Sequence, residues 1–348
     1  RRRASPARVL ITRAASQSQC LHRTLAAGAI TGGTRGVCFV PPGLGPQQKK
    51  TIKGYVMSFL SYLINGVSLG SVYAIIALGY TMVYGIAKML NFAHGDVIMI
   101  GAYVVFTAMT GLQLNPVLSI LIAMIVCTVL GVVIERVAYK PLRNAASNLA
   151  VLITAIGVSY LLQNVALLIF GANPKSFSDV VQLPALNLAG LTIPASTVVT
   201  IIANIVIMIA LSTFVKRSKP GQAMQAVSED RGAAELMGIN VNATIALTFA
   251  IGSALAAIAG ALLCSSYSSL DPYTGAMPGI KAFVAAVFGG IGSIPGAMVG
   301  GILLGVIEYL SKAYISSQIA DAMVFAVLIV VLLVKPAGLF GKKVQEKV

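Results

Sequence analysis

The residue types best suited to chemistry stand together in the stretch "NFAHGD", from Asn91 to Asp96. An imidazole and a carboxylate two positions apart could relay a proton or contribute to a metal site. The other histidine, His22, lies in a compositionally different N-terminal stretch, so the sequence predicts no metal site. Two roles stay open. Asp96 could cap the following helix and Asn91 a preceding turn, or Asn91, His94 and Asp96 could gate or line a polar path through the apolar segments around them.

The sequence contains no pattern typical of nucleotide or triad chemistry. The phosphate-binding motif G-x-x-x-x-G-K-[ST] is absent, because the Gly-Lys pair at 341–342 is followed by another lysine. The cysteines are scattered without the spacing of a disulfide framework or a metal site, and we expect Cys127 and Cys264 to be small core residues. We therefore predict that the chain is not an enzyme, binds no metal or cofactor, and leaves any use of ATP to another polypeptide.

The elements that must position these residues are strongly apolar. The 348 residues are 57% hydrophobic and 10% charged and include 34 glycines and no tryptophan, whereas soluble domains carry about 25% charged residues. Apolar runs of roughly membrane-spanning length occupy 59–84, 95–110, 117–138, 149–170, 194–214, 243–267, 281–309 and 321–334, the second and last being short. The predicted fold is an all-α polytopic membrane protein with about eight hydrophobic segments.

Acidic residues are rare in these runs. Glu135 and Glu308 stand near the ends of two of them, and we expect each to be solvated or paired, with Arg136 and Lys312 as the nearest bases. An intramembrane charge indicates function only when it lies deep in the membrane. These two acids therefore predict no site of their own.

Basic residues in short connections predict the orientation of the segments. Such residues favour the cytoplasmic side, and they occur at Lys140, Arg143, Lys216, Arg217, Lys219, Lys335, Lys342, Lys343 and Lys347. Lysines at 49, 50 and 53, ahead of the first run, leave the orientation of the N-terminus undecided. A further conflict follows, because the connection at 216–242 and the C-terminal tail would both be cytoplasmic although three apolar runs separate them.

A stretch rich in glycine and proline resolves this conflict. The sequence "VFGGIGSIPGAMVGGI", residues 287–302, interrupts the run at 281–309. A helix break at membrane depth is tolerated only where protein buries it or where it lines a cavity. We therefore expect a broken or re-entrant pair of half-helices that begins and ends outside. The residues that could line the cavity or gate a path are Gly289, Gly290, Gly292, Ser293 and Pro295.

One polar island, "KPGQAMQAVSEDRGAAELMGINV" at 219–241, separates long apolar runs. We expect Pro220 to begin one short helix. Ser228 would cap a second helix, with Glu229 and Asp230 in its first turn, and Gly238 is a natural stop. An apolar stripe too short to cross a membrane is formed by Ala233, Ala234, Leu236, Met237 and Ile239. This stripe could rest on the membrane or on the chain's own spans, or it could dock onto a partner.

The island resembles the cytoplasmic coupling loop of ABC-importer permeases of the branched-chain amino-acid type. The positions that match the family pattern are Gly221, Ala223, Ala226, Glu229, Asp230, Ala233, Ala234, Gly238, Ile239, Asn240 and Val241. Gln225 departs from it, since an arginine is commoner there, and the lost charge puts one contact to the partner in doubt. The resemblance implies that the loop at 216–242, including Leu236, presents a short helix to a groove on an ATPase subunit.

Further segments resemble this family in the same order across nearly all of 57–348. They include "NGVSLGSVYAIIALGYTMVYG", "LNFAHGDVIMIGAY", "ERVAYKPLR", "ITAIGVSYLLQN" and "VLLVKPAGLFG". The direct start into the first span is similar to the H-type of the two paralogous permeases. The resemblance implies a multi-pass permease subunit of a bacterial plasma membrane that imports branched-chain or related amino acids. It also implies ATPase subunits that use ATP, a second permease (a paralogue or a second copy), and an extracytoplasmic binding protein.

Residues 1–56 form a different compositional regime from 57–348, which we assign as the transmembrane permease domain. They carry seven arginines, three lysines and no acid, and they contain no methionine, since the first one in the chain is Met57. This composition is typical of an organellar transit peptide, or it marks a non-native extension, which we favour. The net charge of +15 is concentrated there. The other basic residues stand beside membrane spans, where the topology of a membrane protein favours them, so we predict no nucleic-acid partner and only membrane lipid around the spans.

Two other classes of membrane protein compete with the permease subunit. A secondary transporter or channel for a small solute also uses broken helices near the membrane centre, but it would carry deep ionisable residues or an inverted repeat. The sequence shows neither clearly. A structural or assembly protein of the membrane would need neither broken helices nor a docking loop. Co-purification with an ATPase separates the three classes.

Overall fold

The computed structural model describes residues 46–143, 148–177, 180, 184–188 and 191–341. The chain divides into two units, 1–52 and 53–348, and the features below belong to the second, apart from the first turns of the helix that begins at Pro46. Residues 1–45 of the predicted N-terminal extension lie outside the described residues, whereas 46–56 form the first turns of a helix. The assignment of 1–56 as a foreign extension therefore stays a prediction.

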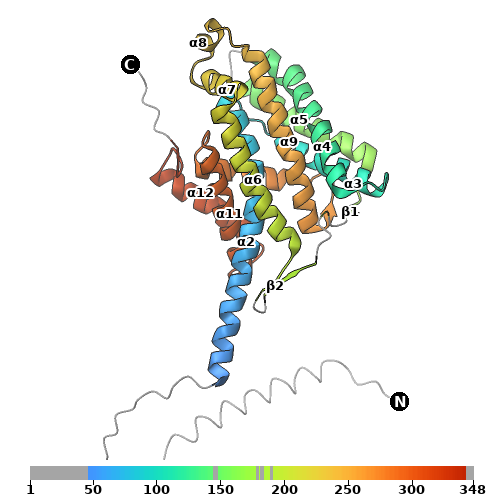
Figure 1. Cartoon of the computed structure of the whole chain (residues 1–348), viewed down its shortest axis with the longest axis vertical. Helices are drawn as coiled ribbons and strands as arrows, with labels where there is room; N and C mark the ends of the chain where they lie inside the picture. Colours follow the sequence, from blue (N-terminus) through green and yellow to red (C-terminus); the bar gives the residue numbers. More distant parts are fainter. Residues whose placement is uncertain (1–45, 144–147, 178–179, 181–183, 189–190, 342–348) are drawn as a thin grey trace, which may run out of the picture. The chain divides into compact units, whose positions relative to one another are not determined.

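The described chain is almost entirely helical (Figure 1). The longer helices are α2 (Pro46–Ala87), α3 (His94–Thr110), α4 (Pro116–Ile134), α5 (Asn148–Phe170), α6 (Ala195–Arg217), α9 (Val241–Tyr267), α10 (Ala276–Gly289), α11 (Ile294–Tyr314) and α12 (Ala320–Val334). A π-helical turn, η1 (Glu135–Tyr139), and a 3-10 turn, η2 (Lys140–Leu142), continue α4. Two short helices, α7 (Lys219–Glu229) and α8 (Arg231–Leu236), lie between α6 and α9.

Four short strands form two small antiparallel pairs. Strand β1 (Lys175–Ser176) pairs with β4 (Ser269–Leu270), so that Lys175 is opposite Leu270. Strand β2 (Leu186–Leu188) pairs with β3 (Leu191–Ile193), so that Leu186 is opposite Ile193. These strands occupy the connections that follow α5 and α9, which the charge pattern assigns to the external side.

The expected all-α polytopic architecture is present. Among the described residues, six helices are long and apolar enough to cross a membrane: 57–87, 116–142, 149–170, 195–217, 241–267 and 294–314. Three shorter apolar helices, α3, α10 and α12, have 17, 14 and 15 residues. At 1.5 Å per residue these three reach only about 21 to 26 Å, less than the ~30 Å hydrocarbon core.

Helix α2 is the centre of this bundle. Of its most apolar stretch 94% is buried, whereas the equivalent share is 11% in α5, which exposes an apolar face suited to lipid or another subunit. Close packing against α11 depends on paired small residues. A Cβ atom added to Gly70 would lie 2.6 Å from the Ile302 carbonyl oxygen, and one added to Gly305 would lie 2.2 Å from the Cα of Gly70. Two facing G-x-x-x-G patterns, 66–70 and 301–305, therefore let the helix backbones meet.

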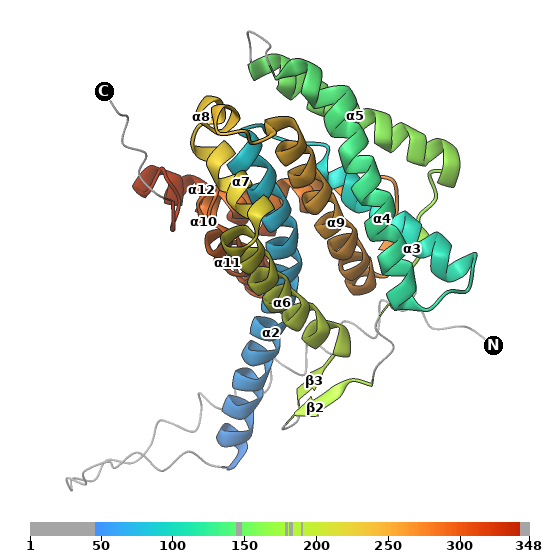
Figure 2. The ribbon, with the colours of Figure 1, turned by 45° about the horizontal axis from the view of Figure 1, so that its top comes forward.

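Helix α9 packs beside α3 and α4 in both views (Figures 1 and 2). Small residues bring these backbones together as well. A Cβ at Gly260 would lie 2.4 Å from the Ile98 carbonyl oxygen, and one at Gly131 would lie 2.1 Å from the Ser253 hydroxyl. Cys127 and Cys264 are fully buried thiols in this region, which confirms their predicted role as small core residues.

Candidate functional site

The helix break predicted near 287–302 is present as a gap of four residues between α10 and α11. Gly290 and Gly292 have φ angles of 105° and 93°, in the region that favours glycine. The Ser293 hydroxyl accepts a hydrogen bond from the Gly296 backbone N–H at 3.2 Å and so caps α11, with Pro295 in its first turn. The local sequence thus ends one helix and begins the next.

The freed backbone groups at this break find partners within the chain. Helix α11 folds back along α10, and a Cβ at Gly289 would lie 1.9 Å from the Gly296 carbonyl oxygen. The segment after α12 covers the tip: Leu339 N–H donates to the Phe288 carbonyl at 2.9 Å and Phe340 N–H to the Gly289 carbonyl at 3.0 Å. Gly289 and Gly290 are buried by this packing, whereas Gly292 and Pro295 are exposed.

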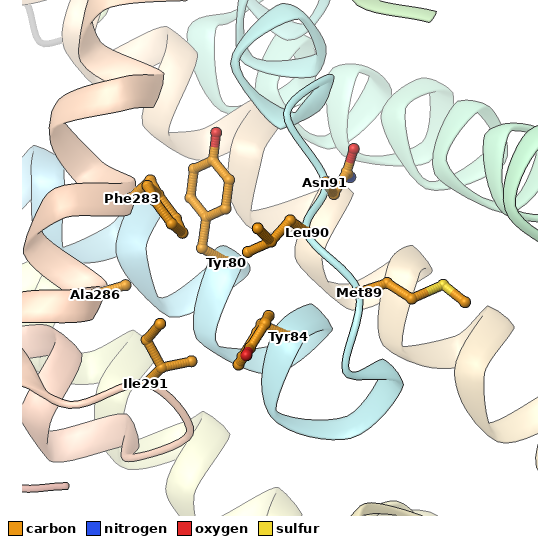
Figure 3. A pocket seen from close by; sticks show the side chains of 8 residues that line it. All are labelled: Tyr80, Tyr84, Met89, Leu90, Asn91, Phe283, Ala286 and Ile291. Atoms are coloured by element: carbon orange, nitrogen blue, oxygen red, sulfur yellow. The ribbon is translucent and has the colours of Figure 1, made fainter. Parts of the chain in front are cut away.

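A second interruption, residues 88–93 between α2 and α3, meets the first. A Cβ at Gly85, near the end of α2, would lie 3.3 Å from the Cα of Gly292. Lys88 adopts a left-handed φ of 53° as the helix ends. A pocket between the two interruptions has a volume of about 10 Å³, the minimum that admits one water molecule. Figure 3 shows Tyr80 beside Phe283 with Leu90 opposite, and the lining also includes Tyr84, Met89, Asn91, Ala286 and Ile291.

The capping roles expected in "NFAHGD" are wrong. Helix α3 has Ala93 at its N-cap position with no side-chain cap. Asp96 instead accepts a hydrogen bond from Gln163 Nε2 of α5 at 2.8 Å. Asn91 Oδ1 accepts one from the Tyr139 hydroxyl at 2.9 Å. The fold provides these distant partners, so neither side chain needs to cap a neighbouring turn.

His94 is buried against the ring of Tyr80, with 4.7 Å between ring centroids. Its Nε2 atom has no hydrogen-bond partner among the described residues. A Cβ at Gly79 would lie 2.5 Å from that nitrogen, so a glycine is required there. Within the described part of the chain, no three His, Cys, Asp or Glu side chains come close enough to hold a metal ion. His94 therefore joins α2 to α3 by aromatic packing.

Two acids that the sequence assigned to span ends are buried ions. Glu308 is inaccessible to solvent and accepts hydrogen bonds from Lys281 at 2.8 Å, Lys312 at 2.6 Å and the Tyr73 hydroxyl at 2.9 Å. The pairing with Lys312 is confirmed. Lys281 also contacts Asp321 of α12 at 2.7 Å. Lys281 was not predicted from the sequence, although a lone lysine at the start of an apolar run is a signal for a buried partner.

The other acid, Glu135, pairs with Arg143 and not with the expected Arg136. Its side chain is buried in η1, a π-helical turn of the kind that is frequent at functional sites. Arg143 also donates to Asn242 Oδ1 in the first turn of α9. The basic connection at 140–143 therefore lies beside the end of the polar island, as their shared cytoplasmic assignment requires.

The polar island forms two helices, α7 and α8, with different caps from those predicted. Ser218 caps α7 by accepting from Gly221 N–H at 3.0 Å, and Asp230 caps α8 by accepting from Ala233 N–H at 3.1 Å. The prediction that Ser228 caps the second helix is wrong, because Ser228 lies inside α7 and its hydroxyl donates a hydrogen bond to the Gln225 carbonyl at 2.7 Å. Likewise Glu229 ends α7 and does not begin α8. Asp230 breaks the helix with an extended backbone, φ −151°.

Gly238 ends the island's second helix, as predicted, with a φ of 81°. The N–H of Gly238 donates to the Glu235 carbonyl and that of Ile239 to the Ala234 carbonyl, both at 3.0 Å, which satisfies the last carbonyls of α8. Glycine is needed here for its conformation alone, since a Cβ would meet no atom within 4 Å. The helix stop is thus encoded locally.

The apolar stripe of the island does not form a single face. Ala234 is only 4% exposed within the chain, whereas Leu236 and Met237 are 90% and 83% exposed. Ala233 is exposed and Ile239 half-buried. Ala234 therefore packs within the chain, and its contribution to a partner surface stays a prediction. A charged substitution at Ala234 would report on this internal packing and not on docking.

The two island helices are tied to the bundle. In α7, Gly221 approaches α6 so closely that a Cβ would lie 2.3 Å from the Phe214 carbonyl oxygen, while Ala226 is half-buried. In α8, the Arg231 guanidinium donates to the carbonyl of Ala87, the last residue of α2. Figures 1 and 2 show α7 and α8 together at one end of the bundle. Arg231 thus joins this end to the interruption at 88–93.

The comparison with known families supports the resemblance seen in the sequence. The family described as "Branched-chain amino acid transport system / permease component" matches residues 62–332. The chain belongs to this family. The matched range includes both interruptions, the island, five of the six long apolar helices and residues 62–87 of the other.

Similar proteins carry the same description over nearly their whole lengths. The high-affinity branched-chain amino acid transport system permease protein LivH of Salmonella typhimurium is 46% identical over 302 residues, covering 83% of this chain and 98% of that protein. The permease protein BraD of Pseudomonas aeruginosa is 43% identical over 305 residues, covering 84% and 99%. A probable LivH of Methanocaldococcus jannaschii is 29% identical over 283 residues, covering 77% and 88%.

Proposed function

We propose that the chain is the H-type permease subunit of an ATP-driven importer of branched-chain or related amino acids in a bacterial inner membrane. Family membership and the shared description of its relatives support this function. The chain would form part of the translocation path together with a second permease, a paralogue or another copy. An extracytoplasmic binding protein would deliver the substrate, and separate ATPase subunits would use ATP.

The observation that carries the coupling role is the exposure of Leu236 and Met237. These two adjacent apolar side chains are 90% and 83% exposed at the end of a polar, capped helix outside the spans, and exposed apolar side chains that lie together favour an interaction site. Because α8 also contacts the end of α2 through Arg231, movement of a docked ATPase would reach the interruption at 88–93. Leu236 and Met237 are therefore the proposed contacts of the ATPase groove.

The proposed path runs along the two facing interruptions. Helices α10 and α11 would form the re-entrant pair that starts and ends outside, which restores an even number of crossings between the island and the C-terminal tail. The pocket of about 10 Å³ between Tyr80, Leu90 and Phe283 supports a closed gate at this point. Non-helical backbone there can change its conformation without breaking a helical hydrogen-bond ladder.

A secondary transporter, the competing class, would carry ionisable residues deep in the membrane, and buried ionisable residues are present in the described chain. Glu308 and Lys281 are buried but satisfied by several partners in the chain. Groups in such a network hold helices together and have no free proton or ion site. The buried Asp96 has no such basic partner, so family membership is what favours the ATP-driven importer.

Co-purification tests the coupling role. We expect Leu236→Glu to lose the ATPase subunit in a pull-down, because it places a charge in an apolar groove. Gln222→Glu, on an exposed position of α7, is the matched control and should retain the ATPase. Both variants should insert in the membrane, since neither position lies in a span. Normal ATPase capture and leucine uptake by Leu236→Glu would contradict the assignment.

A further inference from the structure

A second, larger cleft opens between α3, α5 and α10. Its volume is about 420 Å³, within the ~300–1,000 Å³ range of small-molecule sites. The wall contributed by α5 contains Ser159, Tyr160 and Gln163, and that of α3 contains Asp96. The cleft is distinct from the narrow pocket at the interruptions, although Tyr80 borders both.

Asp96 is a buried carboxylate without a cation. Asp96 is only 2% exposed, and its Oδ1 atom accepts a hydrogen bond from Gln163 Nε2 at 2.8 Å. Among the described residues, the buried acids Glu135 and Glu308 each contact a lysine or arginine, whereas no Lys, Arg or His nitrogen lies within 4.0 Å of Asp96. The N-terminal turn of α3 favours its negative charge but does not neutralise it.

Asp96 lies in the first turn of α3, two residues after His94 at the start of that helix. Its partner Gln163 belongs to α5 and lies seven residues before Phe170 at the end of that helix. A buried charge without a counter-ion in an apolar bundle is costly and marks a candidate functional site.

The remaining walls select the kind of cation. Tyr80, Tyr160 and Tyr273 present aromatic rings, which attract ammonium groups, while Ile156 and Ile280 offer an apolar surface. One carboxylate with an amide and a hydroxyl is a poor set for a metal ion, which takes several oxygen ligands. A primary ammonium group attached to a branched apolar side chain fits both the charge and the walls.

We infer that this cleft is a substrate subsite in which Asp96 binds the α-ammonium group of an apolar amino acid, with Gln163 orienting the carboxylate. The inference rests on the proposed import function and adds a recognition site within the permease itself. Ile156 and Ile280 would contact the substrate side chain. Asp96 is thus a binding residue and Gln163 a positioning residue.

Photochemical labelling tests this subsite in the complete permease–ATPase complex in lipid nanodiscs, without the binding protein. The probe is a diazirine analogue of leucine, compared with its deaminated carboxylic acid, and labelled peptides are mapped by mass spectrometry. We expect the leucine analogue to label α3, α5 or α10 at the cleft, and excess leucine to prevent this. The deaminated analogue should label these helices at least about tenfold less, the effect of one lost charged hydrogen bond of about 1.4 kcal/mol or more.

Variants refine the test. Asp96→Asn should reduce cleft labelling about tenfold, whereas Asp230→Asn, the same change at an exposed position of the island, should leave it unchanged. Gln163→Leu should lower labelling less than Asp96→Asn, because it removes only the orienting contact. Assembly of each variant is checked by size exclusion. If Asp96→Asn fails to assemble, the comparison of the two analogues on the unmodified complex decides.

Several results would overturn the subsite. These are equal labelling by both analogues, labelling only outside the cleft, absence of labelling, or unchanged labelling in an assembled Asp96→Asn complex. Leucine uptake by vesicles that contain the full system is measured in parallel. Uptake without cleft labelling refutes the subsite alone, whereas absence of uptake refutes the proposed import function.

Discussion

Glu308 carries a charge without access to solvent, and the residues around it show what a sequence can and cannot predict at the scale of one side chain. Lys312 stands four residues later, so helical spacing alone predicts that contact. Lys281 is 27 residues away across a helix break, and Tyr73 is 235 residues away. No local pattern links these residues, because only the packing of α2, α10 and α11 brings them together.

Removal of Lys281 should destabilise the protein. Lys281→Met leaves Asp321 without its lysine and removes one of the two lysines that compensate the fully buried Glu308. Breaking a buried pair costs about 3 to 5 kcal/mol, and the partial exposure of Asp321 places this change near the lower end. Denaturant unfolding of the purified protein measures it. Lys335→Met, at an exposed position, is the control, and an equal small loss in both variants would refute a stabilising network.

At the scale of elements, the sequence predicted where helices exist better than how they end. The runs at 95–110 and 149–170 agree with α3 and α5 within one residue, because long apolar segments in a membrane must be helical. The caps of α7 and α8 were harder. Both Ser228 and Asp230 are good capping residues, and which one caps depends on where the backbone becomes extended.

Arg231 should be needed for coupling but not for docking. Its guanidinium joins α8 to the end of α2, while the proposed docking residues Leu236 and Met237 lie elsewhere on the island. We expect Arg231→Ala to retain the ATPase in a pull-down and to lower leucine uptake per ATP hydrolysed about tenfold. The ratio is measured in reconstituted vesicles. Gln222→Ala should keep the wild-type ratio, and a wild-type ratio in Arg231→Ala would exclude this contact as part of the coupling route.

At the scale of the whole molecule, the main feature is the meeting of two interruptions about 200 residues apart in sequence. Glycine and proline predicted a break within 287–302, which the structure places at 290–293, but nothing in the sequence indicated that residues 88–93 would lie against it. The contact follows from small residues on both sides, Gly85 and Gly292, and from the central position of α2. The cover supplied by Leu339 and Phe340 was equally unforeseen, since it uses only backbone hydrogen bonds.

This meeting point predicts that Ser293 changes its accessibility during transport. Ser293 is half-buried beside the exposed Gly292, at the tip that the segment after α12 covers. If the interruptions form a gate, a cysteine there should react with a water-soluble thiol reagent in one nucleotide state and more slowly in the other. The measurement uses Ser293→Cys in a chain without its own cysteines, with and without ATP trapping. Ser253→Cys, at a position that is 2% exposed and packed against Gly131, should remain unlabelled in both states. Equal labelling of Ser293→Cys in every state would show a static tip, and complete protection would mean that neither interruption reaches water, so that the path must run elsewhere in the bundle.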